Sequence, residues 1–135
     1  MKDLVYLDSG IFIAFLNRRD QWHSQAVSLF GTSKPRWSTS LPVVSETYSW
    51  FLHRMGEEAA RTFANLIGSL DGLRLFEAAK ADHDGAMKML TRFRGSKLTY
   101  VDAYSLQLIE KNHIARVWST DHHLSLTGAE MLPRT

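Results

Sequence analysis

The stretch LVYLDSG, residues Leu4 to Gly10, decides the fold, because four apolar residues run directly into an acid and two small residues. A continuous apolar run bounded by turn residues is typical of a strand covered on both faces, as in the centre of a parallel sheet. Residues 11–16 are apolar again, which predicts a helix directly after the strand. Asp8 is then expected at the carboxyl end of a central strand, where open α/β sheets bind their ligands. Taken alone, Asp8 or Ser9 is explained more simply as the N-cap of that helix.

The composition is that of an ordinary globular protein. The chain has 135 residues, of which 44% are hydrophobic and 22% charged, and we expect one domain over residues 1–135. No apolar run approaches the roughly 18 residues that span a bilayer, and the first residues do not form a signal peptide, so we expect a cytoplasmic protein without membrane association. The sequence contains no cysteine, which excludes disulfides, thiolate metal sites and cysteine nucleophiles. Any metal must be bound by carboxylates, imidazoles or water.

The charge balance is too mild to identify a partner. The formal net charge is +2, which does not by itself indicate a nucleic acid. Arg92, Arg94 and Lys97 cluster before Leu98, and such a cluster is most often a solvated face. These three residues are therefore candidates for binding substrate phosphates, and no more than that.

Short apolar segments alternate with helical patterns along the rest of the chain. The expected strands are residues 4–7, 36–39, 73–76, 116–119 and 130–132, and the expected helices are 11–16, 22–30, 41–53, one from Gly56, 86–93, and one that follows residues 98–102 and ends near Asn112. Strands joined by one or two helices imply right-handed crossovers and a mainly parallel sheet with helices on both faces. The predicted class is α/β.

Acids recur where such a fold gathers side chains. Asp121 repeats the pattern of Asp8, because residues 117–121 run a short apolar strand into a hydroxyl and an acid. Asp102 joins them if the segment before it comes up from the same sheet. Glu46, in the second turn of a helix that follows a short strand, can project toward the same edge. The sequence thus offers four acids for one site.

Each acid also has a purely structural explanation. Thr99 and Asp102 match a capping box, Asp121 can cap a turn, and Glu46 can be an exposed helix residue. Four carboxylates brought together repel, by about 1 kcal/mol per pair at 4 Å in water and about 4 kcal/mol at an intermediate dielectric. Such a cluster raises its own pKa values unless a cation neutralises it. With oxygen ligands and no thiols, the natural cation is Mg²⁺ or Mn²⁺, and one of its waters can attack phosphorus.

These acids and their neighbours resemble the acidic motifs of PIN-domain nucleases. The matching pieces are Asp8-Ser9, Val44-Ser45-Glu46-Thr47, Leu98-Thr99-Tyr100-Val101-Asp102-Ala103 and Ser119-Thr120-Asp121-His122-His123-Leu124. Their order and the chain length are similar to those of the single-domain toxins of VapBC toxin–antitoxin modules, and the resemblance runs from Leu4 to Pro133. One departure is Leu124, where the family often has Phe.

The resemblance implies a metal-dependent endoribonuclease with a three-layer α/β/α fold and a five-stranded, mainly parallel sheet. It implies that the catalytic and metal-binding acids are Asp8, Glu46, Asp102 and Asp121, with Asp8 and Asp102 as the most direct ligands. Ser9 and Thr120 would support the site by hydrogen bonding. The implied cofactor is Mg²⁺ or Mn²⁺, and the implied partners are an RNA substrate, a VapB-like antitoxin and a second copy of the chain.

Other interpretations remain open from the sequence alone. A PIN-like module could bind RNA or protein without cutting, although four acids disfavour a phosphate-binding groove. A phospho-acceptor role for Asp8 is disfavoured because no second acid follows it at positions 9 or 10. His122 and His123 are expected to lie outside the chemistry, since adjacent residues usually point in different directions. Aromatic residues are expected in the core or at a dimer interface, and the sequence does not say which could stack on an RNA base.

Overall fold

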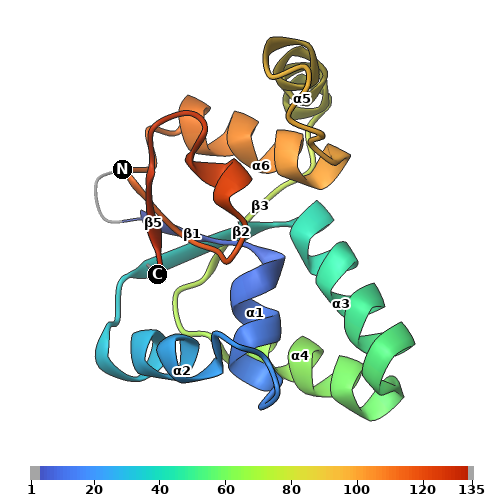
Figure 1. Cartoon of the computed structure of the whole chain (residues 1–135), viewed down its shortest axis with the longest axis vertical. Helices are drawn as coiled ribbons and strands as arrows, with labels where there is room; N and C mark the ends of the chain where they lie inside the picture. The colour runs from blue at the N-terminus through green and yellow to red at the C-terminus, as the bar shows by residue number, and fades with distance from the viewer. Residues whose placement is uncertain (1–3, 134–135) are drawn as a thin grey trace.

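A five-stranded parallel sheet separates two layers of helices in the computed structural model, which describes residues 4–133 (Figure 1). The strands are β1 (Leu4–Leu7), β2 (Arg36–Ser40), β3 (Arg74–Phe76), β4 (Arg116–Trp118) and β5 (Glu130–Leu132). Their order across the sheet is β3-β2-β1-β4-β5, and every neighbouring pair is parallel. All residues of β1 are buried, which explains why its sequence is apolar without alternation.

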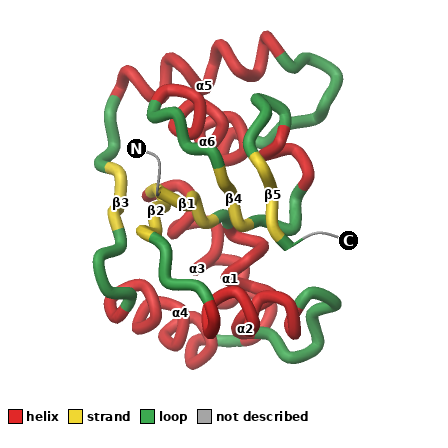
Figure 2. The backbone as a smooth tube through the Cα atoms, turned by 90° about the vertical axis from the view of Figure 1, so that its left-hand side faces the viewer, coloured by secondary structure: helices red, strands yellow, loops and turns green. Residues whose placement is uncertain are grey.

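The helices divide between the two faces of the sheet. They are α1 (Ser9–Leu16), α2 (His23–Thr32), α3 (Leu41–Met55), α4 (Glu57–Ser69), α5 (Lys80–Arg92) and α6 (Tyr100–Lys111), with a short 3₁₀ helix η1 (His122–Ser125). Helices α1 to α4 cover one face, and α5 and α6 cover the other (Figure 2). The three-layer α/β/α prediction is therefore confirmed.

The chain reverses its direction across the sheet between β1 and β4. It first moves outward from β1 through β2 to β3, and α5 and α6 then carry it back to β4 on the other side of β1. A reversal of this kind leaves a crevice at the carboxyl ends of the two strands, because the helices that follow them lie on opposite faces. Asp8 and Ser119 directly follow these two strands.

The buried side chain of Tyr6 links the sheet to helix α6. The Tyr6 hydroxyl forms hydrogen bonds of 2.8 Å with both Ser40 at the end of β2 and Ser105 of α6. Burial raises the pKa of Tyr6, so its phenol stays neutral. Aromatic packing secures the opposite face, where Phe30 lies 5.2 Å from Trp118 and Phe12 lies 5.3 Å from Phe63 between ring centroids.

One condition is not met and one local prediction is wrong. Residues 98–101 do not come up from the sheet, because Thr99 is the N-cap of α6 and the segment already bends into the helix. Helix α5 begins at Lys80 and not near Ala86, since buried Asp82 sits in its first turn and accepts a 3.0 Å hydrogen bond from Lys111 of α6. Within residues 4–133, no helix is both long and apolar enough to cross a membrane.

Candidate active site

Asp8 lies at the junction of β1 and α1 with its carboxylate buried. The residue is 3% exposed, and its backbone is extended at the N-cap position of α1. Its side chain makes no capping hydrogen bond to the helix. Instead, the Ser119 hydroxyl at the end of β4 donates a 2.8 Å hydrogen bond to Asp8 Oδ2. Asp8 therefore occupies the N-cap position as expected, but its carboxylate is bound to Ser119 at the end of the neighbouring strand, which simple capping does not explain.

Ser9 connects this strand end to the third helix. Its hydroxyl donates a 2.8 Å hydrogen bond to Glu46 Oε1, which fixes the glutamate in the second turn of α3 against the first turn of α1. A supporting role of Ser9 in the site stays a prediction, and this bond is the contact through which it would act. Glu46 is therefore held toward the edge of the sheet and is not a freely exposed helix residue.

Asp102 is part of a complete capping box in the first turn of α6. Its Oδ2 accepts a 3.0 Å hydrogen bond from the Thr99 amide, and the Thr99 hydroxyl accepts a 3.1 Å bond from the Asp102 amide. These two hydrogen bonds hold the Asp102 side chain in one orientation. The residue is also buried, with 7% of its surface exposed. The capping role and the place in the site hold together, since a carboxylate has several lone pairs to share.

Asp121 and His123 complete the group from the start of η1. Asp121 Oδ1 accepts a 3.0 Å hydrogen bond from the His123 amide, as a cap does. The His123 ring nitrogen Nδ1 lies 3.0 Å from Asp121 Oδ1 and 3.7 Å from Asp102 Oδ2. Both distances suit an ion pair, yet this buried nitrogen makes no well-directed hydrogen bond. Ligand atoms of Asp102, Asp121 and His123 all lie within 4.8 Å of one another.

The pKa shifts show that the acids interact. The pKa of Asp8 is raised to about 7, mainly by burial and also by the negative charges of Asp102 and Glu46, while hydrogen bonds from Ser119 and the Ser9 amide oppose the rise. Burial also raises the pKa of Asp102, with a further contribution from the charge of Asp121. The four predicted acids thus form one electrostatic chain, from Glu46 through Asp8 and Asp102 to Asp121.

This donor set fits a divalent cation. The available ligand atoms are carboxylate oxygens and one imidazole nitrogen, which are the groups that bind Mg²⁺, Mn²⁺ and related ions. The negative charges of neighbouring carboxylates repel each other and raise their pKa values, and a bound cation would offset this repulsion. The buried His123 nitrogen without a hydrogen bond is a further donor with unused capacity.

The other predicted site residues lie differently. Thr120 makes no side-chain hydrogen bond within residues 4–133; its hydroxyl packs so closely on Gly10 that a methyl group there would overlap it. Arg92 forms an ion pair with Glu110 at 2.9 Å, about 12 Å along α6 from Asp102. Arg94 and Lys97 are exposed on the loop after α5, so a phosphate-binding role for them stays a prediction.

Two residues of the group were missed. Ser119 immediately follows β4 and donates a hydrogen bond to Asp8. The sequence motif around Asp121 led to Thr120 as the predicted supporting residue instead. The expectation that both histidines lie outside the site is wrong for His123, whose ring turns back onto Asp102 and Asp121 because η1 coils directly after the strand. The Ser-x-Asp-x-His spacing from residue 119 to residue 123 was the available signal.

The fold, the switch point and the buried acids define a class of protein. A family model described as "PIN domain" matches residues 5–130, and the chain belongs to this family. It is 25% identical over 131 residues to the 23S rRNA-specific endonuclease VapC20 of Mycobacterium tuberculosis, which covers 93% of this chain and 95% of that protein.

Solved structures agree with this assignment. The crystal structure of Mycobacterium tuberculosis VapC20, titled a Sarcin-Ricin loop cleaving toxin, matches with a TM-score of 0.85 and 26% identity over 93% of this chain and 95% of that one. A toxin–antitoxin complex from Klebsiella pneumoniae matches with a TM-score of 0.68 and 12% identity over 96% of both chains. FitAcB from Neisseria gonorrhoeae matches with a TM-score of 0.65, 12% identity and the same coverage. The two less similar structures support the fold alone.

Proposed function

We propose that this chain is a metal-dependent endoribonuclease and the toxin of a toxin–antitoxin pair. The observation that carries the proposal is the group of Asp102, Asp121 and His123, whose ligand atoms lie within 4.8 Å of one another in a PIN-domain fold, with Asp8 and Glu46 coupled to it electrostatically. The similarity to VapC20 over nearly the whole chain supports ribosomal RNA as the first substrate to test.

The acids have distinct tasks in this proposal. Asp8 and Asp102 hold a Mg²⁺ or Mn²⁺ ion most directly, with Glu46 and Asp121 completing its surroundings directly or through water. When bound, the ion supplies a water of lowered pKa and balances the charge that develops on the phosphate during hydrolysis. Ser119 keeps the Asp8 carboxylate oriented toward the crevice, and Ser9 does the same for Glu46.

His123 has a supporting task. In its protonated form it balances the charges of Asp121 and Asp102, from which its ring nitrogen lies 3.0 and 3.7 Å. In its neutral form the same nitrogen can join the ligand set. Because one form offsets the charge of the acids and the other adds a ligand, replacement of His123 is expected to weaken the site without abolishing it.

The alternative of a binding module without nuclease activity is less well supported. A groove that only holds RNA gains nothing from buried carboxylates beside the phosphates, since these charges repel each other. Burial of the Asp8 carboxylate destabilises its charged form. Metal binding would use that buried carboxylate, whereas simple RNA binding would not.

Cleavage of purified ribosomal RNA in Mg²⁺ or Mn²⁺ tests the proposal. We expect strand breaks that EDTA stops and that Asp8→Asn or Asp102→Asn reduces by about 10²-fold or more, since each variant removes a charge the ion needs. The matched control is Asp71→Asn, an exposed acid that precedes β3 at the opposite edge of the sheet. Full activity in both site variants would refute the proposal, and RNA binding with neither Mn²⁺ binding at the acids nor cleavage would favour the binding module.

The proposed partners are RNA, a VapB-like antitoxin and a second copy of the chain. One structural relative is titled a toxin–antitoxin complex, which supports looking for the antitoxin in the neighbouring reading frame. Co-expression of this chain with that frame is expected to relieve growth inhibition. The homodimer, the single domain over residues 1–135 and the cytoplasmic location stay predictions.

A further inference from the structure

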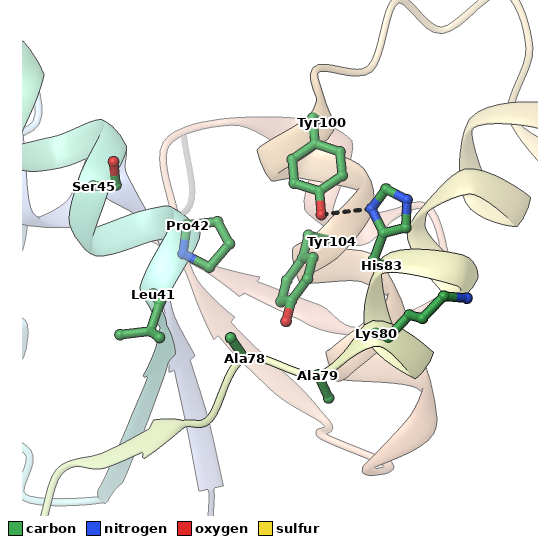
Figure 3. Close-up of a pocket in the computed structure, with 9 residues that line it drawn as sticks. All are labelled: Leu41, Pro42, Ser45, Ala78, Ala79, Lys80, His83, Tyr100 and Tyr104. Carbon is green, nitrogen blue, oxygen red and sulfur yellow. Dashed lines mark hydrogen bonds between the residues drawn. The ribbon is translucent and has the colours of Figure 1, made fainter.

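A cavity of about 590 Å³ is lined in part by α3 and α6, the helices that also carry Glu46 and Asp102 (Figure 3). Its walls come from three places: the first turns of α3, the loop from β3 into the start of α5, and the first turns of α6. Leu41 and Pro42 line one side, and Tyr100 and Tyr104 line another. The volume is in the range of pockets that bind small molecules.

Aromatic rings form the wall supplied by α6 and α5. The ring centroids of Tyr100 and Tyr104 are 5.8 Å apart, and those of Tyr100 and His83 are 5.7 Å apart. A 3.0 Å hydrogen bond joins the Tyr100 hydroxyl to His83 Nδ1, visible as the dashed line in Figure 3, and it restrains the tyrosine ring. Tyr104 is buried, whereas Tyr100 is 40% exposed, so Tyr100 presents an aromatic face that no protein group covers fully.

The cavity shares two helices with the acids. Tyr100 is the first residue of α6, and Asp102 lies in the same turn. Ser45, which lines the cavity, directly precedes Glu46 in α3. The cavity and two of the acids therefore lie at the amino-terminal turns of the same two helices.

The lining chemistry suits a nucleobase. A base is flat and aromatic with polar edges, and the cavity combines aromatic faces with the polar atoms of Ser45 and His83 at its walls. The net charge of +2 gives the chain little general attraction for RNA, and Arg92 is occupied by Glu110. Stacking on an exposed ring adds affinity for the base itself, since each base has a π-face that such a ring can cover.

The structure also decides which aromatic residues are available. Trp118 and Phe51 are buried in the core and cannot stack on RNA. Trp50 is half-buried and lies under the guanidinium of Arg54, near the far end of α3 from the acids. Tyr100 is the exposed aromatic residue among those that line the cavity next to the acids.

We propose that this cavity binds one unpaired nucleobase of the RNA substrate, stacked on Tyr100, next to the phosphodiester bond that is cleaved. The proposal rests on the proposed nuclease function and adds to it the recognition of a single-stranded nucleotide. It predicts that the substrate must be unpaired beside the cleavage site, because a base within a duplex cannot enter the cavity.

Binding of a fluorescent single-stranded uridine 12-mer, measured by anisotropy in EDTA so that no cleavage occurs, tests the proposal. Tyr100→Ala is expected to weaken binding roughly 5- to 100-fold, and Tyr100→Phe to keep it within about twofold, since the ring is what stacks. A 12-mer sugar–phosphate chain without bases separates stacking from charge, and Tyr100→Ala is expected to leave its weaker binding unchanged. Tyr48→Ala is the matched control, because Tyr48 is a similarly exposed tyrosine on α3 outside this cavity.

Photocrosslinking to 5-iodouridine RNA gives an independent readout. We expect mass spectrometry to map the crosslink to Tyr100. Equal binding of the uridine 12-mer by the wild-type protein and Tyr100→Ala would overturn the proposal. It would also be overturned if Tyr100→Ala weakened binding of the chain without bases as much as binding of the uridine 12-mer, or if the crosslink mapped only to other residues. If the wild-type protein cuts RNA normally in these cases, only the base pocket is refuted. If it neither binds nor cuts RNA, the proposed nuclease function fails as well.

Discussion

At the scale of single residues, Asp8 combines two demands that oppose each other. Burial at the end of β1 favours the neutral acid, whereas metal binding requires the carboxylate. Ser119 reconciles the two by donating a hydrogen bond that favours the charged form. The residue therefore titrates close to neutral pH when no cation is bound.

This titration predicts a pH dependence of stability in the metal-free protein. The pKa of Asp8 rises from 3.8 to about 7 on folding, so the folded state retains a proton that the unfolded state has already released. The contribution of Asp8 to stability is complete below about pH 4 and is lost as the pH rises through 7, where the buried charge destabilises the fold by on the order of a few kcal/mol. Urea unfolding in EDTA from pH 5 to pH 8 measures it. Asp8→Asn is expected to flatten this dependence, and identical pH profiles for the two proteins would contradict the assignment.

Ser119→Ala is expected to weaken metal binding at neutral pH. Loss of the donor raises the pKa of Asp8 further, so a cation must displace a proton more often. Calorimetry with Mn²⁺ at pH 7 is expected to show roughly tenfold weaker binding, because a hydrogen bond to a charged group is removed. Ser125→Ala, an exposed serine in η1, is the control and is expected to bind Mn²⁺ as the wild-type protein does. Equal affinity in both variants would mean that Ser119 does not tune the site.

At the scale of elements, the site depends on how closely α1 approaches the loop after β4. Gly10, in the first turn of α1, contacts the hydroxyl and backbone amide of Thr120 with no room for a methyl group. This contact brings Asp8 and the β4–η1 loop together, so Thr120 supports the site by packing and not by a hydrogen bond. Glycine is needed at this position because the two elements approach closely. Its backbone conformation is not the reason, because its φ is not positive.

Gly10→Ala is expected to destabilise the protein by about 1 to 3 kcal/mol, because the new methyl group forces the two elements apart. Adding Thr120→Ala removes the overlapping hydroxyl and is expected to restore part of the loss. Thermal unfolding of both single variants and the double variant forms a mutant cycle. Additive effects in that cycle would show that the two residues do not press on each other. Gly31→Ala is the control, since a methyl group there meets nothing within 4 Å.

At the scale of the whole molecule, four separate segments meet at one edge of the sheet. β1, α3, α6 and the β4–η1 loop each contribute one acid, and these acids are distant in sequence. The unfolded chain cannot hold them together, so the proposed cation is expected to bind the folded state almost exclusively. Metal binding is therefore coupled to the stability of the entire fold.

Mn²⁺ or Mg²⁺ is expected to raise the melting temperature of the wild-type protein. A concentration of 100 times the dissociation constant contributes about 2.7 kcal/mol of stabilisation. Asp8→Asn and Asp102→Asn are expected to lose most of this increase, and Asp71→Asn to keep it. A melting temperature that does not respond to either ion would argue against a metal site at these acids.

The sequence by itself determined the α/β class and the parallel arrangement, and it supplied the acids that are the candidates for the site. An unbroken apolar strand ending in Asp8 carries that information locally, and the same pattern recurs before Asp121. The start of α5 was wrong because burial of Asp82 against Lys111 is a contact between two helices, which local patterns do not contain. The absence of a strand before α6 likewise reflects the capping box, which starts the helix at the edge of the sheet.

Only the tertiary structure decided how the site is completed. Ser119 lies beside Asp8, and His123 beside Asp102, because β4 pairs with β1 and η1 coils over α6, and these pairings join residues far apart in the chain. The cavity lined by Tyr100 likewise exists because three helix ends meet at one edge. Local sequence specifies which side chains are available at strand ends. Long-range packing specifies which of them touch, because that depends on the strand order of the complete sheet.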